Sequence, residues 1–85
     1  NMEWQPDQAI TDLIRHLALQ NSLQYSGKGQ AGSVISRIMG SRADLRPYGK
    51  HIAPLVAKAV AEANSKAETD GLDSITAILE AEAPV

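Results

Sequence analysis

Apolar side chains recur every three or four residues in four separate stretches of the chain, which is the spacing of one face of an α-helix. The first stretch predicts a helix over residues 6–24. Pro6 and Asp7 suit its first turn. Leu19 falls outside the apolar stripe, on an otherwise polar face, where it is free to touch a neighbour. The stripe itself comprises Ile10, Leu13, Ile14, Leu17 and Asn21.

A second predicted helix follows a glycine-rich loop at residues 26–29. Gly40 is its expected C-terminal stop. Ser41 is then a candidate N-cap for a turn that contains Asp44 and Leu45, ahead of Pro47. The apolar side of this helix comprises Ala31, Val34, Ile35, Ile38 and Met39.

The third predicted helix has the most continuous apolar stripe. Pro54 projects from its far face and is expected to bend the helix without ending it. Asn64 and Ser65 weaken the pattern, and residues 69–73 predict a turn. The fourth helix starts near Leu72 and ends near Ala83, where Pro84 stops it. The stripe of the third helix comprises Ile52, Leu55, Val56, Ala59, Val60 and Ala63; that of the fourth comprises Leu72, Ile75 and Leu79.

These four stretches and the short loops between them predict an all-α fold, a compact antiparallel bundle of about four short helices. The length of 85 residues suits a single domain at residues 2–85, and Asn1 is interpreted as a cloning remnant. One Trp, two Tyr and no Phe argue against a β-sandwich or barrel. The lack of cysteine excludes a disulfide scaffold and a thiolate zinc site, and it is typical of a reducing compartment.

Charge is distributed unevenly along the chain. Residues 13–58 carry seven Lys or Arg side chains against Asp44 alone, whereas the segments on both sides are acidic. The overall net charge of −2 therefore hides a basic middle. Such a basic segment is expected of a surface that binds phosphates. The alternative is that these are ordinary solvated charges.

The glycines at 27, 29 and 32 match the pattern G-x-G-x-x-G. A dinucleotide-binding site requires a strand before these glycines, but here a helix is predicted. A Walker A loop is excluded as well, because the lysine does not follow the second glycine. Two interpretations stay open. Either the loop, with Lys28 and the amides of the next helix, attracts phosphate, or it is a flexible connector.

Few residues suit catalysis or metal binding. His16 and His51 lie on different predicted helices without the carboxylate spacing of a metal site. Asp12 and His16, four residues apart, are typical of a surface ion pair. We therefore predict no catalytic residue, no metal and no cofactor in this chain. Tyr25 and Tyr48 either stack on bases or pack at helix ends.

Several short segments together resemble a known family. They are residues 17–25 (LALQNSLQY), 27–35 (GKGQAGSVI) and 37–40 (RIMG), with Leu45-Arg46 and Asn64-Ser65. In order and spacing they resemble the N-terminal helical domain of archaeal-type glutamyl-tRNA synthetases, which places an A-L-x-N helix before a G-K-x-x-x-G-x-V loop and an R/K-x-M-G stop. A related pattern occurs in the N-terminal region of glutaminyl-tRNA synthetases and in the B-subunit tail of the tRNA-dependent amidotransferase. The resemblance covers about residues 8–66.

The resemblance implies a non-catalytic, cytoplasmic domain that contacts glutamate-accepting tRNA, while ATP and Mg²⁺ are expected only in the parent enzyme's catalytic domain. Lys28 and Gly32 match the family's loop, and Arg37 matches its basic position. The charge pattern adds further candidates, so the predicted tRNA-binding residues are Lys28, Gly32, Arg37, Arg42, Arg46 and Lys50. Gly49, the acidic ends and the Ala-rich C-terminal segment depart from the family pattern. The alternatives are a protein-docking module anchored by Leu19, and a free-standing protein like the amidotransferase tail.

Overall fold

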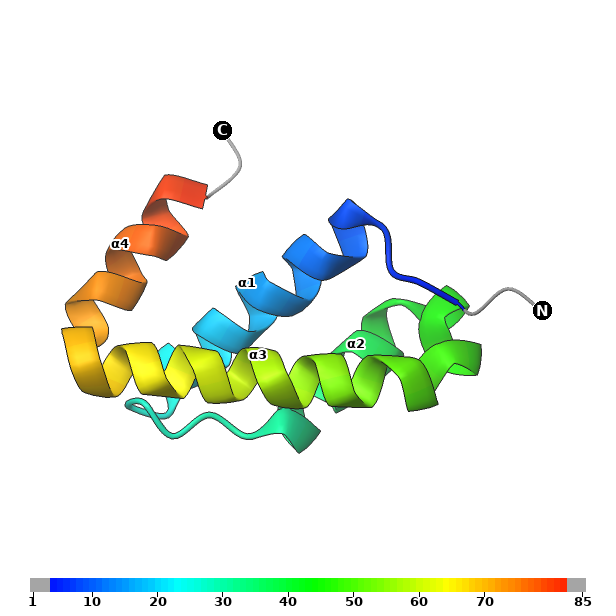
Figure 1. The fold of residues 1–85 in the computed structure, drawn as a ribbon, viewed down its shortest axis with the longest axis horizontal. Helices are drawn as coiled ribbons and strands as arrows, with labels where there is room; N and C mark the ends of the chain where they lie inside the picture. Colours follow the sequence, from blue (N-terminus) through cyan, green and yellow to red (C-terminus); the bar gives the residue numbers. More distant parts are fainter. Residues whose placement is uncertain (1–3, 83–85) are drawn as a thin grey trace.

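The computed structural model describes residues 4–82, which form four α-helices and one 3₁₀ helix and contain no strand (Figure 1). In chain order these are α1 (Gln8–Gln24), α2 (Ala31–Ser41), η1 (Ala43–Tyr48), α3 (Gly49–Asp70) and α4 (Leu72–Glu82). The all-α prediction is therefore confirmed. The sequence-based interpretations of Asn1, Ala83 and Pro84 fall outside the described residues.

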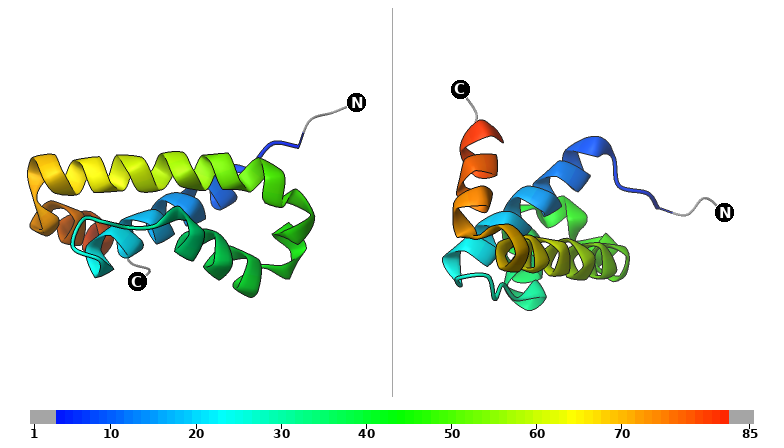
Figure 2. Two further views of the ribbon diagram at one scale, coloured as in Figure 1. Left: turned by 90° about the horizontal axis from the view of Figure 1, so that it is seen from below. Right: turned by 60° about the vertical axis from the view of Figure 1, so that its left-hand side comes forward.

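The longest helix, α3, forms one layer of the molecule, and α1, α2 and α4 pack on the same side of it (Figure 2). In Figure 1, α1 and α4 cross α3 obliquely. The short loops had suggested an antiparallel bundle, but the helices do not run strictly antiparallel. The last helix, α4, turns back from the end of α3 and also contacts α1. As a result, α1 packs against all three other α-helices.

The core lies between these two layers. The apolar stripes predicted from the sequence supply most of it, with one difference on α3, where Leu55 is 37% exposed. The buried hydrophobic residues are Ile10, Ile14, Leu17, Ala18, Leu19, Val34, Ile38, Leu45, Ile52, Val56, Val60, Ala63, Ala67 and Ile75. One modest core of this kind is what a chain of this length can build.

Leu19 touches neighbouring helices, as expected, but the prediction that it is an exposed docking anchor is wrong. Its side chain is only 5% exposed, although it lies outside the main apolar stripe of α1. The reason is tertiary: α1 packs against α2, α3 and α4, so a second side of the helix is covered. Leu19 shares its surroundings with Ala63 of α3 and Ile78 of α4. It therefore belongs to the core and cannot anchor a partner.

The start of α1 and the end of α2 differ from the expected boundaries by one or two residues. Asp7 is the N-cap of α1, and its carboxylate accepts a hydrogen bond from the amide of Ile10 at 2.9 Å. Pro6 consequently stays outside the helix. At the end of α2, the helix continues through Gly40. Ser41 does not cap the next turn; its hydroxyl donates to the carbonyl oxygen of Arg37 at 2.9 Å.

The third helix is longer than its apolar pattern indicates. It continues past Pro54, which lies near its start. It also continues past Asn64 and Ser65, and only Gly71, with φ of +87°, separates it from α4. A positive φ favours glycine, which explains why the break is a single residue. The expected turn at residues 69–73 is thus shorter than predicted.

Candidate nucleic-acid interface

The loop between α1 and α2 is held in place by two asparagine side chains. The Gly29 amide donates to Oδ1 of Asn64 at 2.8 Å, and Nδ2 of Asn64 donates to the Gly29 carbonyl oxygen at 3.0 Å. Oδ1 of Asn21 accepts from the Gln30 amide at 2.6 Å. Asn suits this role because its amide group offers a donor and an acceptor together. Three hydrogen bonds thus hold the backbone of this loop at Gly29 and Gln30.

Glycine is required at two points of this loop. A Cβ atom on Gly29 would lie 2.8 Å from Oδ1 of Asn21 and 3.0 Å from the backbone nitrogen of Ser22. Gly27 has φ of +88°, the left-handed region that favours glycine. Gly32, by contrast, is the exposed second residue of α2, and a Cβ there meets nothing within 4 Å. Glycine is therefore needed at positions 27 and 29, but not at Gly32, which is the glycine predicted to bind phosphate.

The first turn of α2 remains accessible. Its N-cap, Gln30, makes no side-chain capping hydrogen bond. Both Gly32 and Lys28 are exposed. The first amides of a helix have no partner within the helix, so they suit an anion. Lys28 and Gly32 are thus two exposed residues that flank the N-cap of α2 in the chain.

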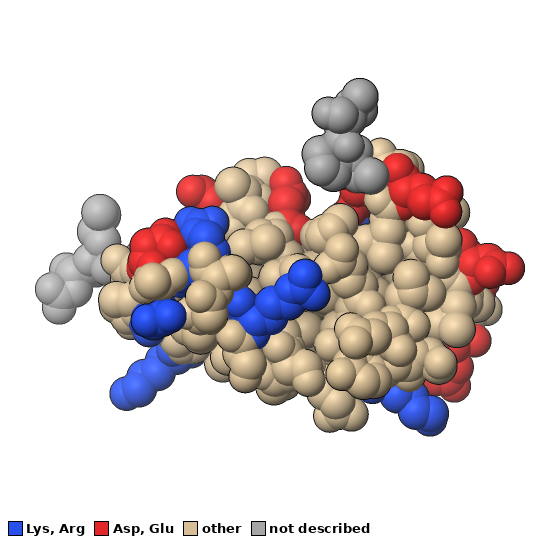
Figure 3. Space-filling model, turned by 180° about the vertical axis from the view of Figure 1, so that it is seen from behind, with Lys and Arg blue, Asp and Glu red and all other residues tan. Residues whose placement is uncertain are grey.

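The structure does not gather all six predicted residues into one cluster. Lys28 precedes α2, whereas Arg42, Arg46 and Lys50 lie in or around η1, beyond the other end of the helix. A helix of 11 residues is about 16 Å long. Arg37 lies between the two groups and is exposed. Most of the blue side chains in Figure 3 occupy its left half, the half that holds η1, whereas red side chains line the upper rim and right edge.

The cations differ in whether a neighbouring acid balances them. Nε and Nη2 of Arg42 donate to the two carboxylate oxygens of Asp44 at 2.9 and 2.8 Å. This hydrogen bonding lowers the pKa of Asp44 and raises the pKa of Arg42 above their ordinary values. Among residues 4–82, by contrast, Arg37, Arg46 and Lys50 have no ion-pair partner. The positive charge at η1 is therefore carried mainly by Arg46 and Lys50.

Arg46 is also held in position. Its Nε donates to the carbonyl oxygen of Met39 at 2.8 Å, which joins η1 to the end of α2. The guanidinium remains exposed to solvent on the rest of its surface. A guanidinium carries five donors in a planar fork, so the bond to Met39 leaves the others available to an anion.

An aromatic cluster lies beside these cations. The rings of Trp4 and Tyr48 are stacked, with centroids 4.8 Å apart and planes inclined by 15°. The ring of His51 lies beside that of Trp4, with centroids 5.8 Å apart and planes inclined by 40°. Tyr48 lies at a helix end, one of the two positions expected from the sequence, whereas Trp4 was not predicted as part of the site. No spacing signal could have found Trp4, because it lies in the segment before α1.

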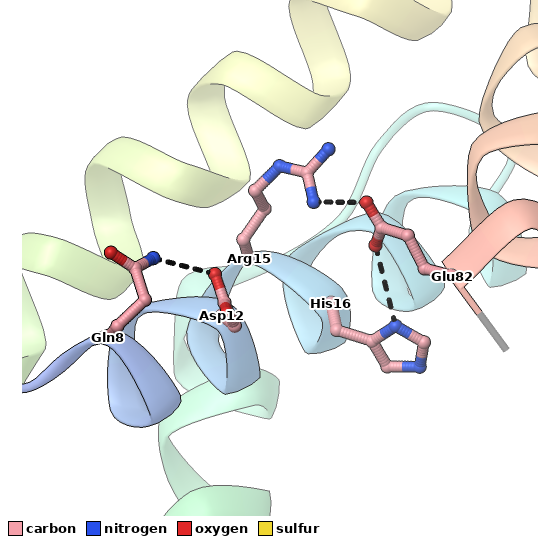
Figure 4. Close-up of polar contacts among 5 residues, drawn as sticks. All are labelled: Gln8, Asp12, Arg15, His16 and Glu82. Carbon is pink, nitrogen blue, oxygen red and sulfur yellow. Dashed lines mark hydrogen bonds and ion pairs between the residues drawn. The ribbon is translucent and has the colours of Figure 1, made fainter. Parts of the chain in front are cut away.

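The far side of α1 is connected to α4 by charged groups (Figure 4). Arg15 forms an ion pair with Glu82, and Nδ1 of His16 lies 3.9 Å from the other carboxylate oxygen of Glu82. Asp12 instead accepts a hydrogen bond from Gln8 at 2.9 Å. The predicted Asp12–His16 ion pair is therefore wrong, because α4 supplies a different carboxylate to His16.

A groove of about 410 Å³ lies between α1, α3 and α4, which we call the α1–α3–α4 groove. Its floor is apolar, and charged side chains edge it. Leu19, the expected docking anchor, forms part of the floor, and the exposed Leu55 forms part of the rim. The lining residues are Pro6, Thr11, Ile14, Arg15, Leu19, Leu55, Lys58, Ala59, Glu62, Ala63, Lys66 and Ile78.

Two further observations concern the described residues as a whole. Within residues 4–82, no three His, Cys, Asp or Glu side chains gather in a way that could hold a metal ion. None of the described helices has the length and apolar character needed to cross a membrane.

Comparison with known proteins gives consistent relatives. A glutamate–tRNA ligase of Methanothrix thermoacetophila is 42% identical over 53 residues, which are 62% of this chain and 9% of the ligase. The ligase of Pyrococcus horikoshii is 36% identical over 62 residues, covering 73% of the chain and 11% of the ligase. That of Sulfurisphaera tokodaii is 39% identical over 61 residues, covering 72% and 11%. This chain is a helical domain related to archaeal glutamate–tRNA ligases.

The relationship to glutamate–tRNA ligases confirms the resemblance found in the sequence. The chain spans only about a tenth of the length of these ligases. No family model matches the chain, and no solved structure matches it.

Proposed function

We propose that this chain is a non-catalytic, N-terminal domain of a cytoplasmic glutamate–tRNA ligase that helps to hold glutamate-accepting tRNA by its phosphate backbone. The observation that carries the proposal is a group of exposed cations on α2, η1 and the start of α3 that have no ion-pair partner among residues 4–82: Arg37, Arg46 and Lys50. The relationship to glutamate–tRNA ligases makes tRNA the nucleic acid to test. ATP and Mg²⁺ belong to the catalytic part of such a ligase.

The arrangement of charge predicts how strongly the domain binds. Lys28, Arg37, Arg46 and Lys50 are each able to neutralise one phosphate, whereas Arg42 is already balanced by Asp44. Four such contacts give a slope of roughly −3 to −4 for log affinity against log salt concentration. Binding by the isolated domain is therefore weak at physiological salt and mostly independent of sequence.

The test is fluorescence anisotropy with glutamate tRNA and an unrelated RNA of equal length, across a salt series. The double variant Arg46→Gln/Lys50→Gln removes two cations from the η1 end, neither of which has an ion-pair partner in the described part of the chain. The control Lys58→Gln/Lys66→Gln changes the net charge by the same amount but alters the rim of the α1–α3–α4 groove. We expect the first variant to lose affinity and to reduce the salt slope by about 1.5 to 2. Equal losses in both variants, or none in either, would contradict the proposal.

The α1–α3–α4 groove favours a second candidate function, a docking module for another domain of the same ligase. Leu55 on its rim is 37% exposed, although Leu19 is buried and cannot serve as the anchor. The test is calorimetric titration of this chain with the remainder of a ligase that contains it. Leu55→Glu abolishes complex formation if the groove is the docking site. Unchanged binding by Leu55→Glu excludes the groove as the docking site.

A further inference from the structure

Two of the three Trp and Tyr residues of this chain meet at one place. Trp4 comes from the segment before α1, and Tyr48 is the last residue of η1. Both rings pack against the core but keep part of their surface open to solvent. His51, which lies in the first turn of α3 and contacts Trp4, is exposed. The cluster therefore presents aromatic surface at the boundary of the molecule.

Two cations lie close to the cluster in the chain, as do the acidic Asp7 and Asp44. Arg46 lies two residues before Tyr48, and Lys50 lies between Tyr48 and His51 in the chain. Both cations are exposed, and neither has an ion-pair partner within the described part of the chain. Exposed aromatic rings next to cations are the combination that binds single-stranded nucleic acids. The rings stack on bases while the cations neutralise the neighbouring phosphates.

We propose that the Trp4–Tyr48–His51 cluster is a stacking site for an unpaired nucleotide base of RNA, with Arg46 and Lys50 binding the adjoining phosphates. This inference rests on the proposed RNA-binding function and specifies which part of the RNA is bound. Bases inside a duplex are already stacked and paired, so they cannot extend an aromatic stack. The site therefore selects a loop, a bulge or a single-stranded end.

Trp4 makes the proposal directly measurable, because it is the only tryptophan of the chain. The probe is a fluorescein-labelled uridine oligonucleotide of about eight residues, within the usual site size of a single-strand binding domain. Its comparison is an oligomer of equal length and charge that lacks the bases. We expect the uridine oligomer to quench Trp4 emission. We also expect it to bind roughly fivefold to a hundredfold more tightly than the abasic oligomer.

Three variants locate the effect. Trp4→Leu lowers the affinity for the uridine oligomer to that for the abasic one, and Trp4→Phe restores most of the difference because it keeps a ring. Tyr25→Leu removes an exposed ring from the loop at the other end of α2 and leaves the difference unchanged. Circular dichroism of each variant verifies that it is folded. If Trp4→Leu is unfolded, the wild type decides: quenching of Trp4 emission by the uridine oligomer but not by the abasic oligomer supports the stacking site, and equal quenching by both overturns it.

The failure of this inference is distinguishable from that of the proposed function. Equal affinity for the two oligomers, with unchanged Trp4 emission, overturns the stacking site and leaves phosphate binding standing. Loss of discrimination in Tyr25→Leu instead of Trp4→Leu overturns the assignment to this cluster. Absence of binding to either oligomer at low salt overturns both the stacking site and the RNA-binding function.

Discussion

Two glycines three residues apart give the sharpest test of the loop geometry, because the same added methyl group is expected to act in opposite directions. Gly29→Ala places a Cβ atom 2.8 Å from Oδ1 of Asn21 and 3.0 Å from the backbone nitrogen of Ser22. The α1 backbone cannot move aside easily, and Asn21 is already bonded to the Gln30 amide. Gly32→Ala meets nothing within 4 Å.

The cost of Gly29→Ala follows from either of two responses. If the loop stays in place, overpacking costs about 1–3 kcal/mol. If the loop moves outward, Gly29 loses both hydrogen bonds to Asn64, at about 1 kcal/mol each. Either response lowers the free energy of unfolding by about 2 kcal/mol, out of the roughly 4–13 kcal/mol expected for a chain of this size. The corresponding fall in Tm is about 8–16 °C.

Gly32→Ala is expected to stabilise the protein by up to about 1 kcal/mol, because alanine is the better helix former and the position is exposed. Urea unfolding followed by far-UV circular dichroism measures both variants against the wild type. A change of the same sign in both variants would refute the reasoning, as would a loss below about 0.5 kcal/mol for Gly29→Ala. The tRNA affinity of Gly32→Ala also tests whether phosphate binding at this turn requires glycine, the residue without a side chain.

Three further substitutions probe other parts of the structure. Leu19→Ala is expected to cost about 2–5 kcal/mol of unfolding free energy, because it opens a cavity between α1, α3 and α4; a loss below 1 kcal/mol in urea unfolding would place Leu19 at the surface. The Ser22 hydroxyl is buried without a hydrogen-bond partner in the described structure, so Ser22→Ala should leave Tm unchanged or raise it; a clear decrease in the thermal unfolding scan would show that the hydroxyl is bonded. Because Arg42 lowers the pKa of Asp44, their pair stabilises the fold above the carboxyl's unfolded pKa and loses this effect as pH falls through the folded value. Asp44→Asn should therefore flatten the acid side of a Tm–pH profile and, by leaving Arg42 unbalanced, steepen the salt dependence of RNA binding; an unchanged acid side would argue against the pair.

The helices and most of the core follow from local pattern alone. Ile52, Val56 and Val60 recur at helical spacing, and all three are buried in the structure. Such periodicity is local, because it depends only on which residues share one face of a helix. The relationship to glutamate–tRNA ligases could likewise be recognised from the order of short sequence segments around Asn21, Lys28 and Gly40.

The candidate site could be predicted only in part. The sequence identified the basic residues, and the structure leaves Lys28 and Arg37 exposed. It could not show that Asp44 balances Arg42 with two hydrogen bonds, nor that α2 separates Lys28 from the η1 end. Trp4 carried no signal, because its partner Tyr48 becomes a neighbour only when the segment before α1 reaches η1.

What the sequence determined by itself is therefore the identity of the helices, their apolar faces and the basic middle of the chain. Tertiary structure decided which neighbour covers each face. The burial of Leu19 depends on α4 turning back toward α1, and the fixed loop at Gly29 depends on Asn64, 35 residues away in the chain. Periodicity records which side of a helix avoids water, but contacts between distant side chains depend on how the helices cross, and that geometry exists only in the assembled fold.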